Sequence, residues 1–429
     1  GATNITIGGG AGGAGNVISG NTGDGIIIAD WLSLGTTGAV IQGNYIGVQA
    51  DGVSPLGNGA KGIHIDPVSG NLIGGVGIND GNVIAYNGEE GVALNPVAGT
   101  NNTILGNSIY ANSDLGIDLN NDGFSGNDVG DADGGPNDML NFPVITSATE
   151  SGGTVTVDFD LDVPAGDYRI EFFDNTAADP SGNGEGETFV GSYDVVGHPG
   201  GSDSYSTSLA GAAGDIITAT TTEEVAAPFG STSEFSAAYT VAALYEISGT
   251  VFEDVVGDVL ADGAIGDATN PGAATVDVYL YRDDGDGNLD AGDTLIGGAP
   301  TQTDANGLYS FTDLIDASYF VVVDSKTVGS SQDATAVQGD IWAEQTYGPV
   351  GGYCDTGIGF SVRGTAGPCY GGITSSISDD FSQWDDREHR ALVTLAGADT
   401  SDVDFGFSFN VVTTTNGGDT RDDDTGANR

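Results

Sequence analysis

The sequence contains very few basic residues, with nine Lys and Arg against 62 Asp and Glu and a formal net charge of −53. Phosphate binding needs clustered cations, so nucleic acids and anionic membranes are excluded as partners. No apolar run reaches the roughly 18 residues of a transmembrane helix, and we expect no membrane insertion. The negative charge also opposes compaction unless cations screen it, which indicates bound calcium, high salt or both.

Cysteine is almost absent, and the two that occur, Cys354 and Cys369, lie close together in a Gly-rich stretch. One close pair in an otherwise Cys-free acidic chain favours a disulfide and an oxidising, extracellular compartment. Two free thiols are the alternative. The chain opens at Gly1 without an initiator Met, so we expect a processed product or a segment of a longer polypeptide.

Helical periodicity is also nearly absent, and 73 glycines favour turn-rich β structure. A pattern of three short apolar segments occurs four times in the first 120 residues, and each segment is too short for a helix. Three strands per round predict a parallel β-helix over 1–141, with an inward column of Ile, Val and Leu. The segments are 5–7, 40–41, 72–73 and 103–105; 16–18, 44–46, 82–84 and 107–109, each reading Asn-x-Ile; and 25–28, 62–65, 91–94 and 116–119.

Gly and Asn separate these segments. Both tolerate the left-handed backbone conformation, and we expect them to serve the sharp corners of the β-helix in that way.

The pattern changes after residue 141. Alternating strands with turn residues between them predict an immunoglobulin-like β-sandwich over 142–244. A second sandwich is predicted over 245–410, with a long insertion at 325–400, and 411–429 is a linker or a strand for a next module. The strands expected in the sandwiches are 154–159, 168–173, 189–193, 204–209, 216–220 and 234–236, and then 245–252, 275–281, 307–311, 319–323 and 403–409.

Several motifs resemble known families. The repeats, followed by Gly130–Asn137 and Asn141–Val144, resemble right-handed parallel β-helix modules of large secreted bacterial proteins. The stretch 247–254, the Asp-rich loop after it and 303–311 are similar to the B-type repeats of Gram-positive serine–aspartate adhesins. These resemblances imply extracellular or cell-surface structural proteins that bind calcium, and they say more about architecture than about role.

The best candidate metal site is the loop 283–293, in which oxygen-bearing side chains occupy alternate positions among glycines. Carboxylate and amide oxygens are the ligands that Ca²⁺ prefers. Leu289 and Leu295 replace the Gly and Glu of an EF-hand, so we expect an EF-like loop between strands; a solvated acidic turn is the alternative. The candidate ligands are Asp284, Asp286, Asn288, Asp290 and Asp293, and the adhesin resemblance implies Asp254, Asp258 and Asp262 as further ligands.

A second acidic cluster follows the last repeat. Calcium would relieve its repulsion, and a charged, solvated loop explains it equally well. Its members are Asp118, Asn120, Asp122, Asp128, Asp131 and Asp133.

An enzymatic reading is weak. Polyuronate lyases need a cationic residue that neutralises the uronate and takes a proton. Residues 1–141 contain one cation, Lys61, and one histidine, His64, which we expect on the outer surface of the β-helix. A hydrolase needs converging carboxylates. Asp30, Asp66 and Asp118 follow or lie within the third segment of different rounds, but at different positions relative to it, so the pattern does not place them on one face. We therefore expect no enzyme.

The leading functional hypothesis is an extracellular, calcium-stabilised structural protein that forms an adhesive or filamentous assembly. The alternative is a β-helix that binds or cleaves carbohydrate, with cell-surface or matrix polysaccharide as partner. The first round shows no cap, and Asn410–Asn416 resembles the entry to another β-helix module. We expect this tail to add to the first round of another copy, head to tail; the same junction made within one longer chain is equally compatible.

Overall fold

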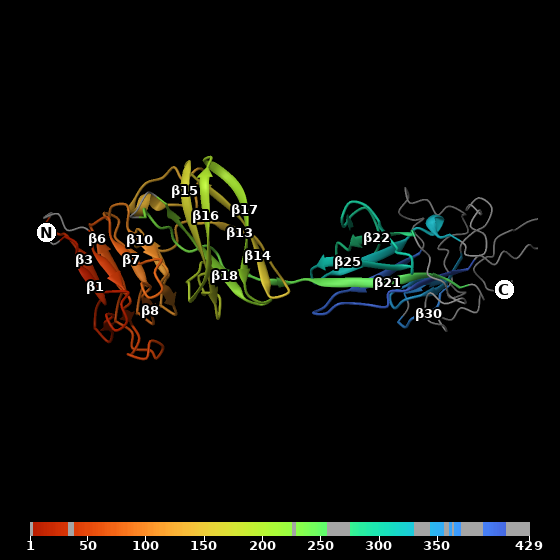
Figure 1. The fold of residues 1–429 in the computed structure, drawn as a ribbon, viewed down its shortest axis with the longest axis horizontal. Coiled ribbons are helices and arrows are strands. Elements are labelled where there is room, and N and C mark those ends of the chain that lie inside the picture. Colours follow the sequence, from red (N-terminus) through yellow and green to blue (C-terminus); the bar gives the residue numbers. More distant parts are fainter. Residues whose placement is uncertain are drawn as a thin grey trace, which may run out of the picture. The chain divides into compact units, whose positions relative to one another are not determined.

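The computed structural model describes residues 3–32, 38–224, 229–254, 275–329, 344–355, 360–362, 364–369 and 389–408. The chain divides into two compact units, Gly1–Ala243 and Leu244–Arg429, and its regular structure is almost entirely β-strand (Figure 1). Two short 3-10 helices, η1 (Pro136–Met139) and η2 (Ser325–Thr327), occur in these ranges. Neither has the length and hydrophobicity of a membrane span. The predicted all-β class is confirmed.

Residues 6–119 form a column of three parallel four-stranded sheets, one for each segment of the repeat. Each round contributes one strand to each sheet, with Ile7 beside Ile41 and Ile41 beside Ile73. The predicted parallel β-helix is confirmed. The sheets contain β1 (Thr6–Gly8), β4 (Val40–Gln42), β7 (Leu72–Gly74) and β10 (Thr103–Leu105); β2 (Val17–Ile18), β5 (Tyr45–Ile46), β8 (Val83–Ala85) and β11 (Ser108–Tyr110); and β3 (Ile26–Ala29), β6 (Ile63–Asp66), β9 (Val92–Leu94) and β12 (Ile117–Leu119).

The interior of the column is the predicted stack of aliphatic side chains. Ile41, Ile46, Ile63, Ile73 and Ile84 are all fully buried. Burying one such side chain contributes about 1.5–3 kcal/mol. Because a shift of one residue would turn every side chain of a strand to the opposite face, these isoleucines also fix the register of the rounds.

Glycine ends the first strand of two rounds because no side chain fits there. Gly8 and Gly74 have φ values of 80° and 79°. A Cβ atom would lie 2.1 Å from Gln42 O at the first position and 2.0 Å from Leu105 O at the second. The oxygen of the next round therefore excludes other residues from these corners.

The left-handed backbone expected at both Gly and Asn is wrong for the asparagines of the Asn-x-Ile segments. None of Asn16, Asn44, Asn82 and Asn107 has a positive φ. The last three are buried, and their side chains bond from one round to the next, as described below. Their polar side chains, rather than left-handed backbone, account for these positions.

Two four-stranded sheets follow the β-helix within the first unit and pack as a sandwich around Phe159, Ile170 and Phe172. Their order is β17-β14-β13-β20 and β16-β15-β18-β19. The strands are β13 (Val144–Ser151), β14 (Thr154–Val163), β15 (Gly166–Asn175), β16 (Thr188–His198), β17 (Gly201–Ala210), β18 (Ile216–Glu223), β19 (Tyr239–Thr240) and β20 (Ala242–Ala243).

The strand predicted at 234–236 is wrong, because these residues have no strand structure. Their side chains are used instead to fasten neighbouring segments. Ser236 Oγ accepts from the backbone N–H of Ala219 at 2.9 Å, and both Glu234 oxygens accept from backbone of the β-helix and its exit segment.

The second unit is another sandwich, with Ile247, Phe405 and Val321 in its core. Its sheets have the order β25-β21-β32-β27-β30 and β23-β22-β26-β31, with β24 on β22 and a separate β28-β29 pair. The strands are β21 (Tyr245–Glu253), β22 (Asp277–Arg282), β23 (Thr294–Leu295), β24 (Thr301–Gln302), β25 (Leu308–Leu314), β26 (Ser318–Val323), β27 (Glu344–Gly348), β28 (Tyr353–Asp355), β29 (Phe360–Val362), β30 (Gly367–Pro368), β31 (Arg390–Thr394) and β32 (Phe405–Ser408).

Candidate metal and assembly sites

The Asp-rich loop connects β22 to β23 and brings three carboxylates together. Oxygen atoms of Asp283, Asp284 and Asp293 all lie within 4.8 Å of one another. Leu289, which breaks the EF-hand pattern, is buried against Tyr281 and Phe320 and anchors the loop to the sandwich. Three converging carboxylates fit a hard cation such as Ca²⁺, which would remove their mutual repulsion.

Two of these three residues, Asp284 and Asp293, were predicted as ligands, whereas Asp283 was not. Asp293 is buried, and burial raises the pKa of its carboxyl. Its two oxygens accept from the backbone N–H of Asp284 at 3.1 Å and of Asp290 at 2.9 Å. These bonds hold the loop closed around the carboxylates.

The other predicted ligands in the described residues are not members of this group of three, and their role as ligands stays a prediction. Asp286 Oδ1 accepts from the N–H of Asn288 at 2.7 Å, and Asp290 Oδ1 accepts from the N–H of Gly292 at 2.6 Å, so both shape local turns. Asp254 is buried at the end of β21 and is not part of the carboxylate group. Asp258 and Asp262 lie outside the described residues.

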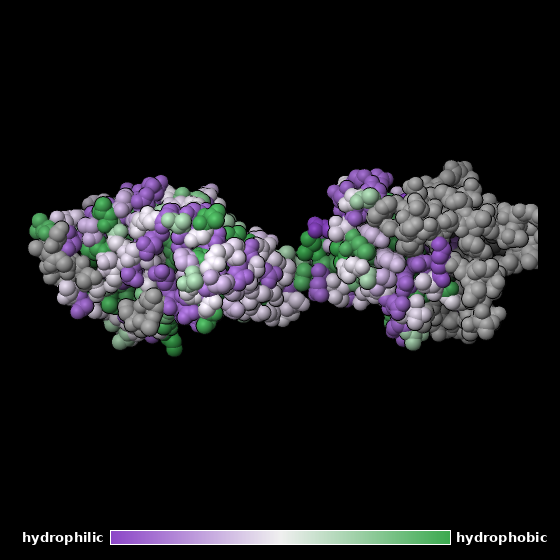
Figure 2. All heavy atoms as spheres, turned by 90° about the horizontal axis from the view of Figure 1, so that it is seen from above, coloured by the Kyte–Doolittle hydropathy of each residue, from purple (hydrophilic) through white to green (hydrophobic). Residues whose placement is uncertain are grey.

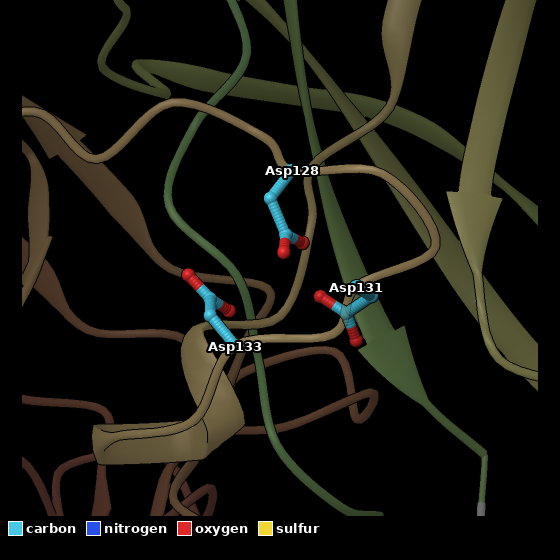
Figure 3. Close-up of side chains that lie close together, drawn as sticks. All are labelled: Asp128, Asp131 and Asp133. Atoms are coloured by element: carbon cyan, nitrogen blue, oxygen red, sulfur yellow. The ribbon is translucent and has the colours of Figure 1, made fainter.

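A second carboxylate group lies in the exit segment, where Asp128, Asp131 and Asp133 face a common space from one loop (Figure 3). Asp131 Oδ1 accepts from the N–H of Asn141 at 2.8 Å, and burial raises the pKa of Asp131 to about 6. Three of the six residues predicted here therefore come together. The arrangement fits both earlier alternatives, a cation site and a self-supporting acidic turn.

Asparagine side chains form three columns that link the rounds of the β-helix. Asn44 donates from its backbone N–H and from Nδ2 to Asn82 Oδ1, at 3.0 and 2.9 Å. Asn82 donates in the same way to Asn107 Oδ1. Each link has its donors in the earlier round and its acceptor in the later one. The columns contain Asn16, Asn44, Asn82 and Asn107; Asn21, Asn58, Asn87 and Asn112; and Asn71, Asn102 and Asn137.

This polarity leaves donors on the last round, and the residues that follow it supply the acceptors. Glu185 Oε2 accepts from the N–H of Ala111 at 2.5 Å, and its Oε1 accepts from the N–H of Asn112 at 2.9 Å. Further closing bonds run from Gly106 N to Glu171 Oε2 (2.8 Å), from Leu119 N to Glu234 Oε1 (2.9 Å), from Ile104 N to Thr232 Oγ1 (2.9 Å), from Ile109 N to Gly186 O (2.8 Å) and from Asn102 N to Asn137 Oδ1 (3.0 Å).

The cap of the β-helix is thus built mainly by the first sandwich. The segment 120–138, which follows the last round, contributes only Asn137 to these bonds. Sequence reasoning missed Glu171, Glu185 and Glu234, because a carboxylate in a sandwich strand or loop carries no local sign that it closes a different domain.

The closing carboxylates are buried, and desolvation raises their pKa values. The pKa of Glu234 rises to about 8, with a further contribution from the charges of Asp118 and Asp122. Burial also raises the pKa of Asp118 to about 6 and those of Glu171 and Glu185 above their usual range. Their backbone hydrogen bonds act in the opposite direction by stabilising the charged form.

The opposite end of the β-helix has no comparable cover in the described ranges. There β1, β2 and β3 each have a strand neighbour on one side only. No donor to Asn16 Oδ1 or Asn21 Oδ1 is found among the described residues, and both side chains are exposed. Ile5 and Val17 are 42% and 48% exposed, and Figure 2 shows hydrophobic residues at this end of the first unit. We call this surface the open face.

The residues considered for catalysis in the β-helix have other partners. Lys61 Nζ lies 2.5 Å from Glu89 Oε2 and 2.9 Å from Glu90 Oε2. His64 Nδ1 lies 3.2 Å from Asp24 Oδ2. The lysine is thereby held by two carboxylates of its own domain rather than presented to an acidic sugar.

The cysteine pair lies in the second unit. Cys369 is fully buried, and its Sγ lies 3.3 Å from Gln345 Nε2. Cys354 belongs to β28, but its side chain is outside the described part of the structure. The disulfide therefore stays a prediction.

No family model matches the chain. Among solved structures, the chain is similar to BcpA, the major pilin subunit of Bacillus cereus, at 9% identity over 62% of this chain and 71% of that one, with a TM-score of 0.20. It is also similar to the group B streptococcus pilus 2b backbone protein (11% identity, 62% and 97%, TM-score 0.20) and to a bacterial adhesin from Mobiluncus mulieris (9%, 63% and 97%, 0.20). TM-scores this low carry no argument about the function of this chain.

Proposed function

We propose that this chain is an extracellular or cell-surface structural protein that assembles with copies of itself, head to tail, into an adhesive or filamentous array. The observation that carries the proposal is the asymmetry of the β-helix: the sandwich closes the last round, while in the described ranges no strand covers the outer edges of β1, β2 and β3, and Ile5 and Val17 are exposed. Exposed edges of this kind are natural sites of strand addition.

Calcium is part of the proposal. The net charge of −53 opposes the approach of two copies. A cation at the loop between β22 and β23 would be held by Asp283, Asp284 and Asp293, where it would neutralise part of the charge and stabilise the second sandwich by mass action. The cysteine pair supports an oxidising compartment.

Assembly can be tested directly. The full chain is examined by light scattering and electron microscopy over a range of protein, calcium and salt concentrations. We expect concentration-dependent fibres or linear oligomers that grow when calcium or salt screens the charge. A chain that stays monomeric under all of these conditions contradicts the proposal.

The metal site has a separate test. EDTA is expected to lower the Tm of the full chain, and Asp284→Asn is expected to remove most of the difference between EDTA and calcium. The matched control is Asp313→Asn, which makes the same charge change at an exposed position of β25, outside the loop. Equal melting curves with and without EDTA would exclude a stabilising calcium ion.

Carbohydrate binding is the second candidate, and one feature favours it. A groove of about 580 Å³ between the β-helix and the sandwich is lined by Ile78, Arg169 and Phe189, among others, and its size suits a small ligand. Arg169 is tied to Asp194 at 2.8 Å, which weakens its use for an acidic sugar. Incubation with polyuronates and measurement of binding and of released reducing ends distinguishes this candidate from assembly.

A further inference from the structure

We propose that the open face binds the segment Asn410–Asn416 of a second copy as an additional, parallel β-helix strand, with Asn410 donating to Asn16 and Val411 beside Val17. This inference rests on the proposed self-assembly and specifies its junction. Four steps lead to it.

The first step is the polarity of the asparagine columns. Asn16 donates from N–H and Nδ2 to Asn44 Oδ1, at 3.0 and 2.9 Å, and its own Oδ1 has no donor among the described residues. The same holds for Asn21 above Asn58. The open face therefore presents acceptors at two of its corners and suits a partner that brings donors.

The second step is that a partner continuing the column suits this face better than a two-fold copy. A two-fold dimer would not repeat the pairing in which each Asn Oδ1 accepts from the N–H and Nδ2 of the preceding round. A partner that continues the β-helix with the same strand direction places N–H groups over these oxygens, as every round of the column does. The contact is therefore heterologous and leads to an open array.

The third step concerns the last round of the β-helix. A second copy cannot use this round as its partner, because Glu185, Glu171 and Glu234 of its own sandwich already occupy the donors there. The strand must come from elsewhere in the chain.

The fourth step identifies that strand from its sequence. Asn410-Val411-Val412 matches the Asn-x-apolar segments Asn16-Val17-Ile18 and Asn82-Val83-Ile84. A second asparagine, Asn416, follows at nearly the spacing that separates Asn16 from Asn21. Arg421 and Arg429 come after it together with Asp419, Asp422, Asp423 and Asp424, so the tail is itself acidic and its approach to another copy needs screening by salt or a cation.

Cysteine crosslinking in the full chain tests the register. The variant Val17→Cys with Val411→Cys is expected to form reducible multimers under mild oxidation, because parallel neighbours on adjacent strands are close enough for a disulfide. The control, Val97→Cys with Val411→Cys, uses an exposed valine elsewhere on the β-helix and is expected to show no more crosslinking than the parent chain. Equal crosslinking in both variants, or only intramolecular crosslinks in the first, overturns the inference.

Removal of the donor gives a second, independent readout. Asn410→Asp keeps the size of the side chain but replaces the Nδ2 donor with a charged acceptor, so we expect the concentration needed for assembly to rise at least about tenfold. Asn306→Asp, at an exposed turn, is the control and should have little effect. An unchanged threshold for Asn410→Asp contradicts the inference.

Deletion of 410–429 separates this inference from the proposed function. Loss of assembly on deletion supports the junction described here. Assembly that persists without the tail overturns the inference but leaves the proposed function standing, with a different segment or another chain as occupant. A full chain that never assembles contradicts both.

Discussion

Replacement of Asn82 by alanine should show how much the asparagine columns contribute to the stability of the β-helix. The Asn82 side chain is buried; it accepts from the N–H and Nδ2 of Asn44 and donates to Ile41 O at 2.8 Å and to Asn107 Oδ1 at 2.9 Å. In Asn82→Ala the buried N–H of Asn44 loses its acceptor, and three further hydrogen bonds disappear.

The expected cost follows from these losses. A buried donor without an acceptor costs about 1–3 kcal/mol, and each of the three further bonds contributes about 0.5–1.5 kcal/mol, so the free energy of unfolding should fall by about 2.5–7.5 kcal/mol. This is a large part of the ~5–15 kcal/mol that stabilises a typical domain. Asn16→Ala is the matched control: Asn16 is exposed, and Asn44 Oδ1 keeps the bond from the Asn16 backbone N–H. Its cost should stay below about 1.5 kcal/mol.

The measurement is urea unfolding combined with hydrogen exchange, read at residues 40–46 so that the β-helix is followed separately from the second unit. Asn82→Ala should accelerate exchange of the Asn44 amide and lower the unfolding midpoint, while Asn16→Ala should change both only slightly. If the two variants lose the same stability, the columns do not stabilise the interior in the way argued here.

Further predictions concern the cap, the disulfide and the charge. Burial raises the pKa of Glu234 to about 8, so the folded first unit binds a proton more tightly than the unfolded chain. The Tm of this unit should therefore be highest near pH 5 and fall as the pH rises through 8. Glu234→Gln should flatten this dependence of Tm on pH. Glu185→Ala should lower the Tm of the first unit by removing the side-chain acceptors of two backbone N–H groups, as circular dichroism would show. Intact mass of the unreduced chain should be lower by two hydrogens if Cys354 and Cys369 are bridged, and labelling of two thiols would refute the bridge. Added salt should raise the Tm, since it screens the charge of −53, and a Tm independent of salt would refute that reasoning.

Much of the fold follows from local pattern. A strand buries alternate side chains, so the periodicity of the isoleucines predicted the three sheets of the β-helix and most strands of both sandwiches. Gly8 and Gly74 also carry a local signal, since only glycine fits where the next round's oxygen approaches. The Asp-rich loop was predicted for the same reason, as oxygen ligands and glycines close together in the chain.

The tertiary structure decided what depends on distant residues. Asn44 and Asn82 are separated by 38 positions in the chain, so their bond and the polarity of the columns could not be seen in the sequence, and their asparagines were assigned to turns. Glu185 closes the β-helix from 73 positions away and was missed for the same reason. Within the acidic loop, the fold brings Asp283, which was not predicted as a ligand, to Asp284 and Asp293, while Asp286 and Asp290 stay predicted ligands. The sequence by itself determined the strands and their buried faces, because that information is local and periodic; the polar contacts that set the two ends of the column apart arise only when residues far apart in the chain are brought within hydrogen-bonding distance.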